Sequence, residues 1–228
     1  MPTDLIARNL EQIEESLRQS CRKAGRARDS VTVVAVSKTF PAEAVARAIA
    51  LGIADIGENR VQELREKRTL VPSSARWHLI GHLQSNKVRE ASRIADVIQT
   101  IDSQALAEKI SRECGMIDRT IRVLIQVNVG REAQKSGVDP EGVDELVRSI
   151  GELPHLRLSG LMAIPPLDSD PRPYFSALRS LRDSVREKLQ MDSFEELSMG
   201  MSEDFHIAIE EGATMIRLGR RLFGDRSA

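Results

Sequence analysis

The sequence predicts an α/β fold, a single (β/α)₈ TIM barrel with an extra N-terminal helix. Three observations favour this fold. Eight short apolar segments recur at an average spacing of about 28 residues, and helical patterns separate them. The first segment is almost wholly apolar, as expected for a strand covered on both faces in a parallel sheet. The G-x-G-x-x-G turn that is typical of a doubly wound open sheet does not follow it.

The chain opens with a predicted amphipathic helix. Apolar residues from Leu5 to Cys21 recur near the helical period, and Gly25 marks the end of the pattern. The first predicted strand, residues 31–37, follows it. A helix ahead of the first strand is not part of the repeating unit, so it is predicted as an addition to the barrel.

The other predicted elements alternate along the chain. The strands are residues 53–57, 77–81, 95–100, 120–129, 156–163, 194–199 and 214–219. The helices are residues 41–52, 59–68, 85–93, 103–114, 140–150, 174–189 and 205–212. The proline-rich segment 164–173 is predicted as a long loop on the working face, because the strand–helix alternation resumes after it. Residues 1–228 are therefore predicted to form one domain.

Composition excludes several classes of partner. Lys and Arg number 33 against 34 Asp and Glu, so the chain lacks the basic excess that nucleic-acid binding needs. No apolar run approaches the roughly 20 residues that cross a bilayer, and the amino terminus does not resemble a secretory signal. Cys21 and Cys114 are far apart in sequence, which fits a reducing compartment. We therefore expect a cytoplasmic protein that binds neither nucleic acid nor membranes.

Lys38 is the first candidate functional residue. The chain has few lysines among its basic residues, and Lys38 follows the most apolar strand. The two-residue period places it on the same face as Val34 and Val36. If that face lines the barrel, the apolar surroundings favour the neutral amine, which can form a Schiff base. Two alternatives stay open: a lysine that extends into solvent, or one that pairs with Glu58.

The segments after the last two strands suggest a phosphate site. Ser202 is predicted to cap the helix 205–212, and Gly219 allows a ligand close to the backbone. Arg220 adds positive charge. Acidic residues 203–204 would repel a phosphate unless their side chains point away, and a simple N-cap with a glycine turn remains the alternative.

Polar residues at other strand ends are weaker candidates. Arg217 lies inside the last strand, where its guanidinium needs an acceptor, either Glu58 or the ring nitrogen of a ligand. His78 and His82 are separated by a strand-like segment and are not expected to bind a metal together. No other motif indicates a metal site, a P-loop or a nucleophile elbow.

A strand-end lysine and a phosphate corner in one barrel suggest pyridoxal 5′-phosphate (PLP). Six segments together resemble the pyridoxal phosphate homeostasis protein family, also called the YggS or proline synthetase co-transcribed family, which is similar to the barrel of alanine racemase, a fold-type III PLP barrel. The resemblance extends from about residue 5 to residue 226. The segments are VTVVAVSKTFP, IGENRVQE, WHLIGHLQSNK, LSGLMAIPP, SMGMSEDFHIAI and IRLGRRLFG.

The resemblance implies a role in PLP homeostasis for this chain, with storage or delivery of PLP and an effect on amino-acid and keto-acid pools. It also assigns residues to PLP. They are Lys38 for the Schiff base, Ser202, Gly219 and Arg220 for the phosphate, Arg217 for the ring nitrogen, and Asn59 and His82 near the ring. Where Arg220 stands, the family often has a small hydroxyl residue, so the contact there is expected from the main-chain N–H or the guanidinium.

Strong catalysis is not expected. Arg217 cannot protonate the ring nitrogen, so the carbanion of a substrate would be poorly stabilised. Alanine racemase adds a second base, a tyrosine from a further domain, whereas the only tyrosine here is Tyr174 and the chain stops at Ala228. The alternatives are a small amino-acid racemase and a Schiff-base aldolase that needs no cofactor. Expected partners are PLP and PLP-dependent apoenzymes, and a monomer is slightly favoured over a homodimer.

Overall fold

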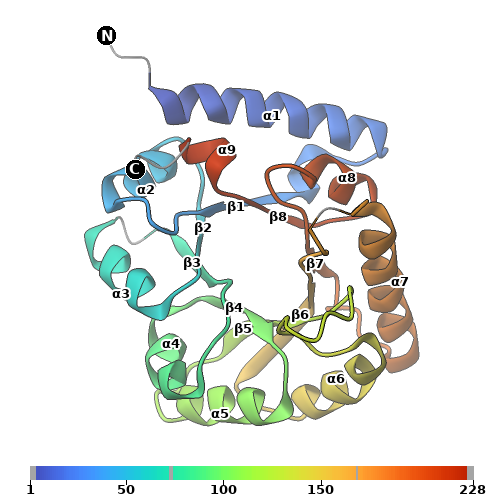
Figure 1. Cartoon of the computed structure of the whole chain (residues 1–228). Helices are drawn as coiled ribbons and strands as arrows, with labels where there is room; N and C mark the ends of the chain where they lie inside the picture. The colour runs from blue at the N-terminus through green and yellow to red at the C-terminus, as the bar shows by residue number, and fades with distance from the viewer. Residues whose placement is uncertain (1–3, 72–73, 168, 225–228) are drawn as a thin grey trace.

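The computed structural model describes residues 4–71, 74–167 and 169–224. Eight parallel strands form a closed barrel in chain order, and β1 pairs with β8 to complete it. Helices surround the barrel (Figure 1). The predicted fold class is confirmed.

The strands lie within a few residues of their predicted positions. They are β1 Thr32–Val36, β2 Asp55–Glu58, β3 Arg76–Leu79, β4 Val97–Ile101, β5 Ile121–Gln126, β6 Leu156–Met162, β7 Glu196–Ser198 and β8 Met215–Leu218. The α-helices are α1 Leu5–Lys23, α2 Ala42–Ala50, α3 Val61–Leu70, α4 Val88–Ile94, α5 Gln104–Gly115, α6 Val143–Gly151, α7 Arg172–Leu189, α8 Phe205–Glu210 and α9 Arg220–Phe223. Short 3₁₀ helices are η1 Arg28–Ser30, η2 Ser85–Lys87 and η3 Pro140–Gly142.

The extra helix α1 covers the part of the barrel where α9 is too short to do so. It lies outside β1 and β8, beside α8 and α9 (Figure 1). Its apolar stripe buries Ile13, Leu17 and Cys21. Since α9 has only four residues, α1 supplies most of the apolar cover on this side.

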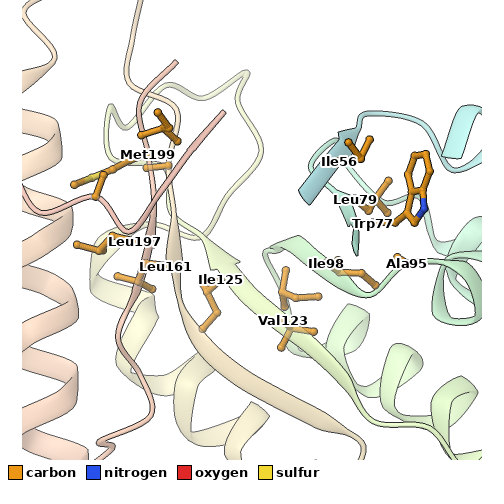
Figure 2. Packing of buried hydrophobic residues seen from close by; sticks show 14 of the residues in the cluster. Ile56, Trp77, Leu79, Ala95, Ile98, Val123, Ile125, Leu161, Leu197 and Met199 are labelled. Atoms are coloured by element: carbon orange, nitrogen blue, oxygen red, sulfur yellow. The ribbon is translucent and has the colours of Figure 1, made fainter. Parts of the chain in front are cut away.

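Side chains of the strands point alternately outward to the helices and into the barrel. Outward-facing side chains pack against the helices, and Figure 2 shows Ile56, Trp77, Leu79, Ile98 and others in this layer. A separate, smaller cluster fills the inside of the barrel. It consists of Val34, Val97, Leu124, Met162 and Met215. The small size of the inner apolar cluster leaves room for polar side chains inside the barrel.

One strand end and one short helix differ most from the prediction. The strand predicted over 120–129 ends at Gln126, because the backbone beyond it pairs with the loop before α6: Asn128 N–H donates to Val138 O at 2.9 Å. The helix α9 was not predicted, since four residues carry no periodic pattern.

No helix in the described segments is long and apolar enough to cross a membrane. The same segments contain no cluster of His, Cys, Asp and Glu side chains that could hold a metal ion. His78 is buried inside the barrel, whereas the His82 side chain is 56% exposed, so the two histidines lie in different environments.

Candidate functional site

The face of β1 that leads to Lys38 lines the barrel interior. Val34 belongs to the inner cluster. A Cβ built on Gly57 would lie 2.9 Å from Val34 Cγ1 and 3.6 Å from Val36 Cγ2, so both valines lie on the same inner side of the sheet. Lys38 follows two residues later, in the turn between β1 and α2, and it is half-buried. Among the described residues, no carboxylate forms an ion pair with Lys38.

The alternative pairing of Lys38 with Glu58 is wrong, because Glu58 has another partner. Lys67 Nζ on α3 donates to Glu58 Oε1 at 2.6 Å, and the Ser37 hydroxyl donates to the same oxygen at 2.6 Å. Glu58 is fully buried, and this burial raises the pKa of its carboxyl although both partners oppose the shift.

The Glu58–Lys67 pair holds the backbone next to Lys38. Lys67 Nζ also donates to the carbonyl oxygen of Ser37 at 2.6 Å. Ser37 is thus fixed through both its side chain and its carbonyl group. Because Ser37 immediately precedes Lys38, the pair fixes the position from which the Lys38 side chain extends.

Arg217 is buried inside the barrel without a carboxylate partner in the described chain. Its guanidinium donates to Ser198 Oγ at 2.8 Å and to the Ala163 carbonyl at 2.9 Å. The alternative pairing with Glu58 is therefore wrong for Arg217 as well. Burial lowers the pKa of Arg217 to about 10, so the side chain remains charged at neutral pH.

A chain of buried polar side chains continues from Arg217. Ser198 Oγ donates to Gln99 Oε1 at 2.6 Å, and Gln99 Nε2 lies 2.8 Å from His78 Nδ1. His78 Nε2 lies 2.8 Å from Asp55 Oδ1. Neither Gln99 nor His78 was predicted as a site residue. Both are buried polar residues within their strands, but only the register of separate strands connects them.

The predicted capping role of Ser202 is wrong. The N-cap of α8 is Asp204, and Ser202 lies in the preceding turn. Asp204 Oδ1 accepts from the backbone N–H of Met201 at 2.6 Å, so the carboxylate is held by the loop. The acidic residues 203–204 therefore precede the helix, whereas the sequence predicted them in its first turn.

The segments after β7 and β8 lie side by side. The backbone N–H of Arg217 donates to Gly200 O at 3.0 Å, and the Arg221 guanidinium donates to Ser202 O at 3.2 Å. Backbone N–H groups of residues 202–203 and 220–221 have no acceptor in the part of the chain that is described. These groups offer several free donors to an anion.

Gly219 connects this corner with β1. A Cβ built on Gly219 would lie 3.4 Å from the Val36 carbonyl oxygen, an ordinary contact. Arg220, the first residue of α9, is exposed. The ends of β1, β7 and β8 thus gather Lys38, Ser202, Arg217, Gly219 and Arg220.

Asn59 follows β2 and His82 follows β3, the next two strands after β1 in the barrel. Both line a cavity of about 350 Å³, together with Gln126 at the end of β5 and residues of the following loop such as Asn128. The loops that carry them touch closely, since a Cβ on Gly81 would lie 2.2 Å from Asn59 O. Lys38 and the phosphate corner are not among the described residues that line this cavity.

A larger cavity of about 700 Å³ lies near the strand starts, at the opposite end of the barrel. It is lined by Arg68, Ser74, Ala75, Arg76, Asp96, Thr120, Arg122 and Arg157. Three of these arginines already pair with carboxylates: Arg68 with Asp96, Arg76 with Asp55, and Arg122 with Glu196. This cavity lacks a lysine and is distant from the carboxyl ends of the strands, where barrel enzymes bind their ligands.

The barrel, with a lysine after β1 and a buried arginine in β8, is of the alanine racemase class, which a match to a family model shows. The model described as "Alanine racemase, N-terminal domain" matches residues 8–227. Curated relatives are more specific. The pyridoxal phosphate homeostasis protein of Aquifex aeolicus is 41% identical over 95% of this chain and 96% of its own. That of Escherichia coli K12 is 38% identical over 97% of both chains. The chain belongs to the pyridoxal phosphate homeostasis protein family.

Solved structures agree with this assignment. PipY of Synechococcus elongatus PCC7942, described with PLP bound, has a TM-score of 0.84 and 36% identity, and the match covers 96% of this chain and 100% of PipY. D-threonine aldolase of Filomicrobium marinum has a TM-score of 0.77 at 15% identity, over 96% of this chain and 60% of the aldolase. The latter similarity concerns the fold alone.

Proposed function

We propose that this chain binds PLP reversibly as a Schiff base on Lys38 and stores or delivers it in the cytoplasm. The observation that carries the proposal is the contrast between two lysines beside one loop. Lys67 Nζ is engaged by the Glu58 carboxylate and the Ser37 carbonyl, whereas Lys38 has no carboxylate partner in the described residues. Lys38 is therefore the amine available to an aldehyde.

The chemistry of the donors fits each end of PLP. When bound, PLP supplies an aldehyde that condenses with amines and a ring that withdraws electrons. Free backbone N–H groups at residues 202–203 and 220–221, with the charge of Arg220, suit its phosphate. Arg217 can donate to the ring nitrogen, and Asn59 and His82 suit the polar edge of the ring. The relative PipY, described with PLP bound, supports the same ligand for this chain.

The properties of Arg217 favour a carrier over a catalyst. The guanidinium is charged at neutral pH and donates without releasing a proton, so the ring nitrogen stays unprotonated. An unprotonated ring is a weak electron sink. We further propose that PLP-dependent apoenzymes receive the cofactor and that the chain acts as a monomer. The buried Cys21 and Cys114 are free thiols whose pKa values are raised by burial, which suits a reducing cytoplasm.

The absorption spectrum of the purified wild-type chain tests the proposal. We expect a visible absorption band, either directly or after addition of PLP, and we expect borohydride to fix the cofactor on the peptide that contains Lys38. A colourless chain that PLP cannot reconstitute contradicts the proposal. Inactivation by borohydride only in the presence of a sugar phosphate would favour the aldolase alternative.

The match to the racemase domain supports one other candidate, a small amino-acid racemase. This activity needs a second proton-transferring group, and the one tyrosine, Tyr174, lies half-buried in the first turn of α7. We expect no exchange of the α-hydrogen of L-alanine or L-serine in deuterated water above a control without protein. Exchange that is clearly faster than this control, and is lost in Lys38→Ala, would favour the racemase.

A further inference from the structure

A continuous chain of hydrogen bonds crosses the interior of the barrel. It joins Arg217 on β8, Ser198 on β7, Gln99 on β4, His78 on β3 and Asp55 on β2. Ser198, Gln99 and His78 are fully buried, and Arg217 is 4% exposed. The chain begins with a cation at the mouth and ends at a carboxylate that also pairs with Arg76, at 3.1 Å.

The hydrogen-bonding capacity of each group sets the direction of every bond. Arg217 can only donate, so Ser198 Oγ accepts and must place its own proton on Gln99 Oε1. The amide group of Gln99 then donates to His78 Nδ1. His78 must therefore carry its proton on Nε2, where it donates to Asp55. Every member donates to the next, and bonds aligned in this way strengthen one another.

This series of hydrogen bonds fixes the orientation of the Arg217 guanidinium. Bonds to Ser198 and to the Ala163 carbonyl fix two of its nitrogen atoms, and the remaining N–H groups have no protein acceptor among the described residues. Apolar side chains could fill the same interior without the cost of burying polar groups. The polar chain is therefore better explained by orientation of Arg217 than by stability.

We propose that Ser198, Gln99 and His78 are positioning residues that act through Arg217 and aim its free N–H groups at the ring nitrogen of bound PLP. This inference rests on the proposed function. It adds residues from β3, β4 and β7 to a site that otherwise consists of groups at the barrel mouth. Ser198 bonds Arg217 directly, and among the described residues its hydroxyl links the others to the guanidinium.

The test compares PLP binding by single variants, measured by titration of the visible absorption band. Ser198→Ala removes one oxygen atom, and Gln99→Leu interrupts the chain one residue further away. We expect each to weaken PLP binding about tenfold and to shift the band, because a charge-assisted hydrogen bond loses its fixed geometry. Ser198→Thr keeps the hydroxyl and is expected to restore binding. Ser198→Ala is small enough to decide the test even if Gln99→Leu does not fold.

A double variant separates positioning from a purely structural role. In an Arg217→Lys background, Ser198→Ala is expected to change PLP affinity by less than about twofold, since the group through which it acts is gone. An unchanged tenfold effect in that background would overturn the inference, as would wild-type affinity and spectrum in Ser198→Ala. A wild-type chain that binds no PLP would instead overturn the proposed function.

Discussion

Replacing Lys38 with alanine is expected to abolish covalent attachment of PLP and to leave the purified chain colourless. Lys38 is the amine next to the interior-facing part of β1 that has no carboxylate partner in the described residues. Without it, only non-covalent contacts from the phosphate corner and Arg217 remain. The measurement is the visible spectrum after addition of PLP, followed by borohydride reduction and peptide mass analysis.

Lys188→Ala is a matched control for this experiment. Lys188 lies at the end of α7, its side chain is 57% exposed, and its partner is the surface residue Asp144. This variant is expected to keep the wild-type spectrum and the modified Lys38 peptide. Fixation of PLP on Lys67 in the Lys38→Ala chain would contradict the assignment, because it would show that the Glu58 pair does not keep Lys67 from reacting.

The fold was predictable because burial repeats along the chain. Strands of a parallel barrel are covered on both faces, so each leaves a short apolar segment, and the helices between them leave a helical period. α9 left no such signal, since a single turn has no period. The N-cap of α8 was misplaced because Ser202 and Asp204 are both residue types that favour N-caps, and the sequence does not show that the loop continues to Asp204, whose carboxylate accepts from the N–H of Met201.

The site was predictable only in part, since its polar groups meet across the barrel. Lys38 and Arg217 were found as charged residues at the end of a strand or within one. Gln99 and His78 are ordinary in sequence and become connected only through the register of separate strands. The role of Lys67 depends on how α3 packs over β2, a tertiary contact that helical periodicity does not contain.

Removing the partner of Glu58 is expected to cause a large loss of stability. Lys67→Met leaves a fully buried carboxyl whose Oε2 already has no hydrogen-bond partner. Breaking a buried ion pair on one side typically costs about 3–5 kcal/mol. The double variant Glu58→Gln with Lys67→Met removes both charges and is expected to lose clearly less. Equilibrium unfolding in urea gives the free energy of unfolding for all three chains.

The pH dependence of this loss identifies Glu58 as its cause. Burial raises the pKa of Glu58 in the folded chain above its ordinary value of 4.5, and Lys67 opposes that shift. Lys67→Met removes the opposition, so the pKa in the folded variant rises further. A carboxyl with a raised pKa binds its proton more tightly in the folded state, so the free energy of unfolding falls as pH rises from 4.5 towards the folded value.

The stability deficit of Lys67→Met relative to wild type is therefore expected to be small near pH 4.5 and to grow as the pH approaches neutrality. For the titration of one proton, this deficit in the free energy of unfolding can change by at most about 1.4 kcal/mol per pH unit. The double variant has no titrating group at position 58, whereas wild type loses stability as the pH passes the raised pKa of Glu58. Its deficit is therefore expected to shrink, and not to grow, over the same pH range. If both chains show the same deficit at every pH, the loss of stability does not come from the ionisation of Glu58, and this explanation of the Lys67→Met effect is wrong.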